Sequence, residues 1–138
     1  MESGEAAVHP YSSDIEAHEH AMAVSIGEVV RELEHLLGAT MVAAIGGVTE
    51  TRAVAQWKNG REPQRPHTLR FALQIGTMIA NNMDREVARA WFHGGNPHLE
   101  DATPLALLRD RPLGEVQGPL LAAARAFALR MNHNGRHS

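Results

Sequence analysis

The sequence of 138 residues contains no cysteine, which excludes disulfides, a thiol nucleophile and zinc sites built from thiolates. Aromatic residues make up only 4% of the chain, and β-branched residues are few beside Ala and Leu, so helices are favoured over sheet. The longest apolar run, residues 41–48, is far shorter than the ~20 residues that span a bilayer. The first residues lack the basic and apolar regions of a signal peptide. We therefore expect an all-α, cytoplasmic protein without a membrane partner.

The residue types needed for catalysis are also scarce. No serine lies in a nucleophile elbow, no glycine loop is typical of a phosphate cradle, and no close carboxylate pair lies in an apolar setting. Nine histidines are present, but His18 and His20 are two residues apart and would face different directions on a helix. A zinc site needs three or four converging ligands. We expect neither an enzyme, nor a metal site, nor a cofactor.

Charge is distributed unevenly along the chain, although the formal net charge is only −3. Residues 1–34 hold eight acids and one base, whereas residues 35–75 hold five bases and two acids. A basic central stretch is typical of a surface that contacts a polyanion. A mixed, solvated surface is the alternative.

The apolar spacing predicts helices separated by glycine and proline signals. The expected helices cover residues 14–37, 39–45, 49–59, 66–81, 84–93, 104–111 and 114–131, with N-caps at Asp14, Thr49, Asp84 and Thr103. Residues 1–13 and 132–138 are expected to be flexible tails. The organisation is then two halves, residues 14–82 and 83–131. The last helix either kinks at Pro119 or begins there.

Residues 39–60 have the pattern of a helix-turn-helix. Gly47 can adopt the positive φ that the turn requires, and Val54 and Trp57, three residues apart, share the inner face of the second helix. Arg52 and Gln56 then project from its outer face, and such side chains read base edges in the major groove. An αα-hairpin that only packs within the protein is the alternative. The Glu50 carboxylate, at the start of this helix, argues against DNA contact because it would be repelled by the phosphates.

The candidate DNA contacts are therefore the polar residues of this helix and the cations that follow it. They are Thr51, Arg52, Gln56, Lys58, Asn59, Arg61 and Arg65. Arg52 and Gln56 are the expected base readers. Lys58, Arg61 and Arg65 are expected to contact phosphates. One such motif makes few base contacts, so a homodimer is expected.

Two adjacent aromatic residues, Trp91 and Phe92, mark the second half of the chain. Neighbouring residues of a helix point about 100° apart, so a single core does not easily bury both. One of them is expected to serve a partner surface, because tryptophan is enriched at interface anchors. The alternative is that both belong to the core.

The sequence motifs of both halves resemble those of a known family. The turn motif A-x-I-x-G-V-T (residues 43–49), V-x-x-W-x-x-G (residues 54–60) and an arginine-bearing fourth helix are similar to the helix-turn-helix of the Xre/MbcA/ParS antitoxin family. The second half resembles that family's toxin-binding domain in a W…NP.L…TP…LL series (residues 91–108), followed by apolar residues of the final helix. Together the two matches cover roughly residues 25–130.

The resemblance implies a DNA-binding type II antitoxin. Such a protein neutralises a RES-domain toxin that consumes NAD, and it represses the operon that both share. The toxin-binding residues would then be Trp91, Phe92, Asn96, Pro97, Leu99, Leu107 and Leu108. A stand-alone helix-turn-helix regulator, or a protein-binding module with a relict DNA-binding motif, are the alternatives.

Overall fold

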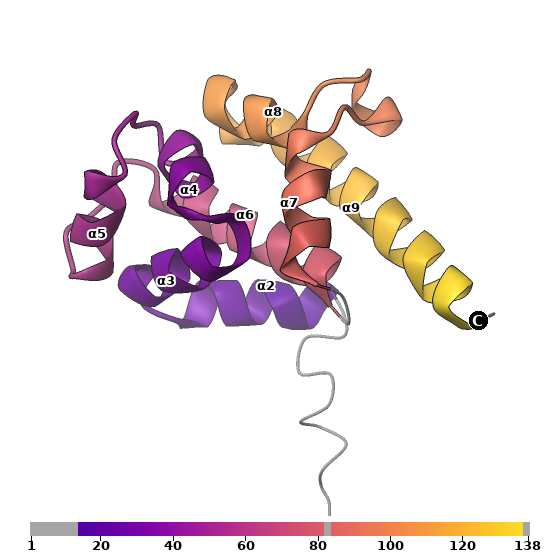
Figure 1. The fold of residues 1–138 in the computed structure, drawn as a ribbon, viewed down its shortest axis with the longest axis horizontal. Coiled ribbons are helices and arrows are strands. Elements are labelled where there is room, and N and C mark those ends of the chain that lie inside the picture. The colour runs from indigo at the N-terminus through magenta and orange to yellow at the C-terminus, as the bar shows by residue number, and fades with distance from the viewer. Residues whose placement is uncertain (1–13, 82–83, 137–138) are drawn as a thin grey trace, which may run out of the picture.

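A computed structural model describes residues 14–81 and 84–136. The described residues form α2 (Asp14–Ala23), α3 (Ile26–Leu37), α4 (Ala39–Ile45), α5 (Arg52–Lys58), α6 (Pro66–Ala80), α7 (Arg85–His93), the 3₁₀ helix η1 (Pro97–Leu99), α8 (Pro104–Asp110) and α9 (Leu113–Arg136) (Figure 1). They include no strand, which confirms the all-α prediction. The predicted tail over residues 1–13 lies outside the described residues.

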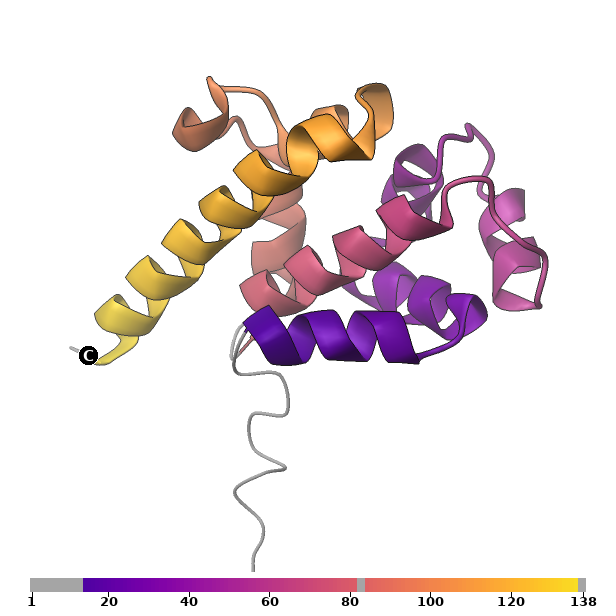
Figure 2. The ribbon, with the colours of Figure 1, turned by 180° about the vertical axis from the view of Figure 1, so that it is seen from behind.

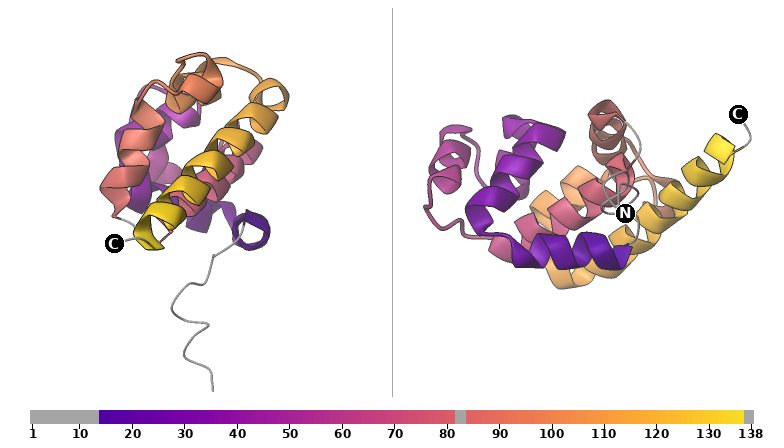
Figure 3. Two further views of the ribbon diagram at one scale, coloured as in Figure 1. Left: turned by 90° about the vertical axis from the view of Figure 1, so that its right-hand side faces the viewer. Right: turned by 90° about the horizontal axis from the view of Figure 1, so that it is seen from below.

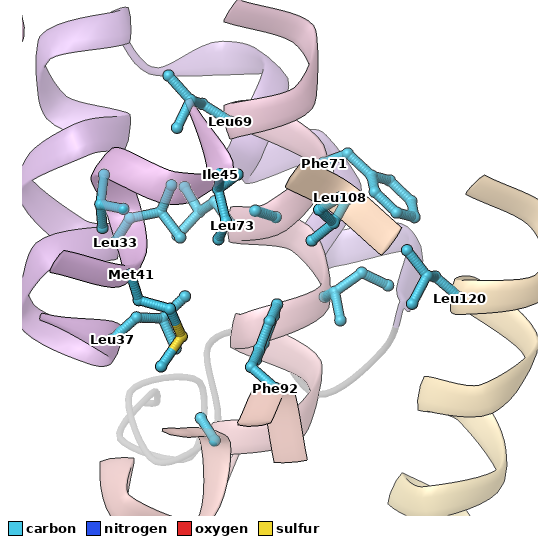
Figure 4. Close-up of a cluster of buried hydrophobic side chains, with 14 of the residues drawn as sticks. Leu33, Leu37, Met41, Ile45, Leu69, Phe71, Leu73, Phe92, Leu108 and Leu120 are labelled. Carbon is cyan, nitrogen blue, oxygen red and sulfur yellow. The ribbon is translucent and has the colours of Figure 1, made fainter. Parts of the chain in front are cut away.

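Helix α6 is the centre of the fold. It contacts α2, α3, α4, α7 and α9, so most of its side chains are buried. Figure 2 shows α6 between α2 on one side and α9 on the other. Figure 4 shows side chains from α3, α4, α6, α7, α8 and α9 converging in one core. The boundary expected near residue 82 therefore does not separate two cores within the described chain.

The prediction of a single helix over residues 14–37 is wrong. The helix is interrupted at Val24 and Ser25, and the Ser25 hydroxyl accepts a hydrogen bond from the backbone N–H of Glu28 at 3.2 Å. The Arg70 guanidinium donates to the carbonyls of Ala21 (2.8 Å) and Val24 (2.7 Å). Apolar residues keep a helical spacing across this break, whereas the capping serine and the distant arginine end one helix and begin another.

Helix α9 differs from its prediction at both ends. It begins at Leu113, contains Pro119 and continues to Arg136. Proline lacks an N–H, so it removes the hydrogen bond to the carbonyl of Glu115, four residues earlier. Pro119 is exposed, whereas Val116 and Leu120 are buried on the inner face. The apolar face therefore holds the helix together across the proline, and the loose segment expected from residue 132 is helical as far as Arg136.

The remaining helices follow their start and stop signals. Residues 39–45 form α4 as predicted, and α6 begins at Pro66. The Thr103 hydroxyl accepts from the N–H of Ala106 at 3.0 Å and so caps α8. None of the helices in the described ranges combines the length and the apolarity needed to cross a membrane.

Candidate nucleic-acid interface

Two glycines form the turn between α4 and α5, and each is required for a different reason. Gly47 has a φ of +86°, as the sequence predicts. Gly46 has an ordinary φ, but a Cβ atom there would lie 2.4 Å from Cη2 of Trp57. The N–H of Val48 then donates to the carbonyl of Ala43 at 2.9 Å. The tryptophan of the second helix therefore packs directly on the backbone of the turn.

The orientation of α5 agrees with the prediction. Val54 and Trp57 are 1% and 4% exposed, so this side of the helix lies against the protein. The open side carries Thr51, Arg52, Gln56 and Asn59, all of them exposed. The N-cap is Thr51 and not Thr49, and its side chain makes no capping hydrogen bond. Figures 1 and 3 show α5 at one end of the molecule, away from α9.

The expected base readers have weak partners on the surface. The Arg52 guanidinium donates to the Glu50 carboxylate at 3.0 Å, and these side chains are 78% and 68% exposed. The Arg61 guanidinium reaches the side-chain oxygen of Gln56 at 3.4 Å. Exposed ion pairs contribute only about 0–1 kcal/mol. Both contacts can therefore be exchanged for a ligand at little cost.

Lys58 does not lie on this open side. Its ammonium forms an ion pair with the Glu34 carboxylate of α3, and both side chains are about 30% exposed. The carbonyl of the same residue accepts from Arg31 at 3.4 Å. Lys58 therefore has a partner on α3 within the protein, and its expected role as a phosphate contact stays a prediction.

Arg65 is likewise directed into the protein. Its guanidinium donates to the carbonyl of Arg109 at 2.9 Å and reaches that of Leu108 at 3.5 Å, at the C-terminal end of α8. Cations at this end of a helix bind its unpaired carbonyls and oppose its dipole. Arg65 therefore joins the segment before α6 to the end of α8, and its assignment as a phosphate contact stays a prediction.

A second ion pair lies beside this contact. The Arg109 guanidinium donates to both oxygens of the Asp110 carboxylate, at 2.7 and 2.8 Å. This hydrogen bonding lowers the pKa of Asp110 below its usual value, and the nearby positive charge of Arg65 acts in the same direction. The end of α8 therefore carries a carboxylate that remains ionised to lower pH than an ordinary aspartate.

The basic stretch seen in the sequence is therefore not a basic patch. Of its five cations, Lys58, Arg65 and Arg70 are bound to groups of other helices. Arg52 and Arg61 remain exposed, and the exposed carboxylates of Glu50 and Glu62 belong to the same stretch. Charges of both signs thus accompany the open side of α5. A linear sequence could not reveal this, because the partners of the three inner cations lie on distant segments.

The residues that the resemblance assigns to a partner surface lie mostly in the core. Trp91, Phe92, Leu99 and Leu108 are buried, and Leu107 is half-buried. The Asn96 side chain caps η1 by accepting from the N–H of His98 at 2.9 Å, and Pro97 alone of the seven is exposed. This series therefore builds and caps the second half, and a partner would contact the surface around it.

The expectation that one of Trp91 and Phe92 faces a partner is wrong for this structure. Their rings are T-shaped, with centroids 5.2 Å apart and planes at 77°. Helix α7 contacts α3 and α6 as well as α8, so elements cover it in more than one direction. Both aromatic residues are consequently buried, which the 100° rule for a single core does not anticipate.

Within the described part of the chain, no group of three or more His, Asp or Glu side chains could hold a metal ion. Comparisons with protein-family models, with curated proteins and with solved structures found no match.

Proposed function

We propose that the protein is a DNA-binding antitoxin, which reads an operator through α5 and neutralises a RES-type toxin encoded in the same operon. The observation that supports this best is the placement of α5. A glycine turn precedes it, its apolar side is buried, and its open side carries Thr51, Arg52, Gln56 and Asn59. These are the side-chain types that pair with base edges in the major groove.

The chemistry of each reader follows from its donors and acceptors. Arg52 can donate two parallel hydrogen bonds to O6 and N7 of guanine, and Gln56 can pair with N6 and N7 of adenine. Arg61, just beyond the helix, is the cation that remains for phosphate. Each protomer thus supplies few contacts, and a two-fold dimer on a palindromic operator would double them.

The toxin-binding part of the proposal depends on the motif resemblance of residues 91–108. Because most of these residues form the core, the toxin would contact exposed residues of the second half, such as Pro97 and Leu129. The test is co-expression with the product of the neighbouring open reading frame. Neutralisation predicts a stable complex and restored cellular NAD; a neighbour with no effect on NAD would contradict the antitoxin assignment.

A second candidate function is supported by the charge arrangement. If the helix-turn-helix is relict, the protein acts only by covering a partner. The inward direction of Lys58 and Arg65, together with the exposed Glu50, favours this reading. Salt-titrated binding of the DNA upstream of the gene, compared with a scrambled duplex, separates the two candidates. An operator-binding protein prefers the first duplex and loses affinity as salt rises, whereas a relict motif shows neither effect.

A further inference from the structure

A small recess is lined by residues from the end of α7, from η1 with the loop before it, and from α9. Figure 1 shows η1 and α9 on the side of the molecule away from α5. Its volume is about 180 Å³. Trp91, Pro97 and Phe127 contribute apolar surface, and Arg130 and His98 also line it. An engineered apolar cavity of about 150 Å³ binds benzene, so this recess has room for a single ring.

Trp91, one of the residues that line the recess, carries a donor that the protein leaves unsatisfied. The side chain is 7% exposed, and its indole Nε1–H is buried without a hydrogen-bond acceptor. No other buried side-chain polar atom in the described residues lacks a partner. Buried donors are paired in the great majority of proteins, so an orphaned one needs an explanation. An acceptor brought by a ligand would supply the missing partner.

The charge at the recess has one sign. The Arg130 guanidinium is exposed, and it forms no ion pair or hydrogen bond with a residue of the described ranges. Among the described residues, no Asp or Glu lines the recess. The lining therefore combines an unpaired cation, an unpaired N–H donor and aromatic surface, which together match an anionic acceptor on an apolar body.

We propose that this recess binds a carboxylate carried on a small aromatic or apolar group. The ring lies against Trp91 and Phe127, and the carboxylate pairs with Arg130 and the indole N–H of Trp91. A free organic acid and the carboxyl terminus of a peptide share this chemistry. The site lies on other elements than α5, so it stands independently of DNA binding.

The test uses the indole signals of the full-length protein. The chain has two tryptophans, so a ¹H–¹⁵N spectrum contains two indole cross-peaks, and Trp91→Phe assigns them. Benzoate should shift the Trp91 cross-peak and leave that of Trp57 in place, with a dissociation constant of the order of 1 mM. Benzamide has the same shape without the charge and should bind at least tenfold more weakly. N-acetylphenylalanine is the third probe, and the tighter of the two acids identifies the source of the carboxylate.

Two variants separate this site from general anion binding. Arg130→Gln should weaken benzoate at least fivefold, whereas Arg125→Gln removes an equal charge from α9 outside the recess and should not. Trp91→Phe keeps an aromatic ring but deletes the donor; ligand-observed NMR should then show at least fivefold weaker benzoate binding, with a melting temperature no lower than that of the wild type. An unmoved Trp91 signal, equal binding of benzoate and benzamide, or equal losses for the two arginine variants would overturn the proposal.

Discussion

A Cβ atom on Gly47 would lie 2.9 Å from Cζ of Arg65, so the Arg65 guanidinium occupies the space beside the turn that a side chain would need. The same guanidinium binds the carbonyl of Arg109 at 2.9 Å. The turn that precedes α5 and the end of α8 are thus held by one side chain. This contact connects the turn before α5, the helix proposed to read DNA, with the second half of the chain.

Gly47→Ala should destabilise the fold for two reasons. The φ of +86° strains an L-residue, at a cost of about 1–2 kcal/mol, and the new methyl group also collides with Arg65. Gly60→Ala is the matched control, because its φ is +108° but nothing lies within 4 Å of a Cβ atom there. Denaturant unfolding should therefore show a larger loss for Gly47→Ala. Equal losses would mean that Arg65 does not fill this space.

Arg65→Ala should lower the free energy of unfolding by about 1–2 kcal/mol, because α8 loses the donor to its last carbonyls. At protein concentrations and temperatures where the variant is folded, its DNA affinity should remain within about twofold of the wild type. Denaturant titration and fluorescence anisotropy measure the two effects. A variant of wild-type stability that has lost DNA affinity would restore Arg65 as a phosphate contact.

The ion pair between Lys58 and Glu34 should appear as a coupling energy in unfolding. In a double-mutant cycle with Lys58→Met and Glu34→Gln, we expect a coupling of about 0.5–1 kcal/mol, because both groups are partly screened from water. The charge of Lys58 is engaged by α3, so Lys58→Met should leave the salt dependence of DNA binding unchanged. Strict additivity of the two substitutions would contradict the ion pair. A flatter dependence of DNA affinity on salt in Lys58→Met would show that Lys58 contacts DNA.

Asp110 should make a small contribution to how the free energy of unfolding changes with pH in the acidic range. Because its hydrogen bonds from Arg109 lower the pKa of Asp110 in the folded state, the pair stabilises the fold above the pKa of an unfolded aspartate. That contribution is lost as the pH falls through the lower folded-state pKa. Arg109→Ala should raise the pKa of Asp110, measured by carboxyl ¹³C NMR, whereas Arg111→Ala, which breaks the pair with Glu115, should change it less. An unchanged Asp110 titration in Arg109→Ala would contradict this account.

Local signals predicted what depends on neighbours in the sequence. The positive φ of Gly47, the cap at Thr103 and the buried side of α5 with Val54 and Trp57 all follow from such signals. The interruption between α2 and α3 at Ser25 was not predicted, because it depends partly on Arg70, which binds the end of α2 from a distant helix.

Long cations and core aromatics were the least predictable residues of the candidate site. Lys58 and Arg65 have flexible side chains, and only the folded chain shows that Glu34 and the end of α8 lie within their reach. Trp91 and Phe92 are both buried because α7 is covered in more than one direction, and this is a property of the tertiary arrangement. The sequence pattern therefore predicted the buried and open sides of α5 but overestimated the positive charge near its open side.

The salt dependence of binding to the DNA upstream of the gene tests the central claim most directly. With Arg61 as the exposed cation assigned to phosphate, the plot of log affinity against log salt should have a slope of about −1 per protomer, and not the roughly −3 that phosphate contacts by Lys58, Arg61 and Arg65 together would give. Arg52→Ala should reduce affinity about tenfold and lessen the preference over scrambled DNA, whereas Arg125→Ala, exposed on α9, should change neither. Affinity that is independent of salt and equal in the two variants would show that α5 does not read DNA.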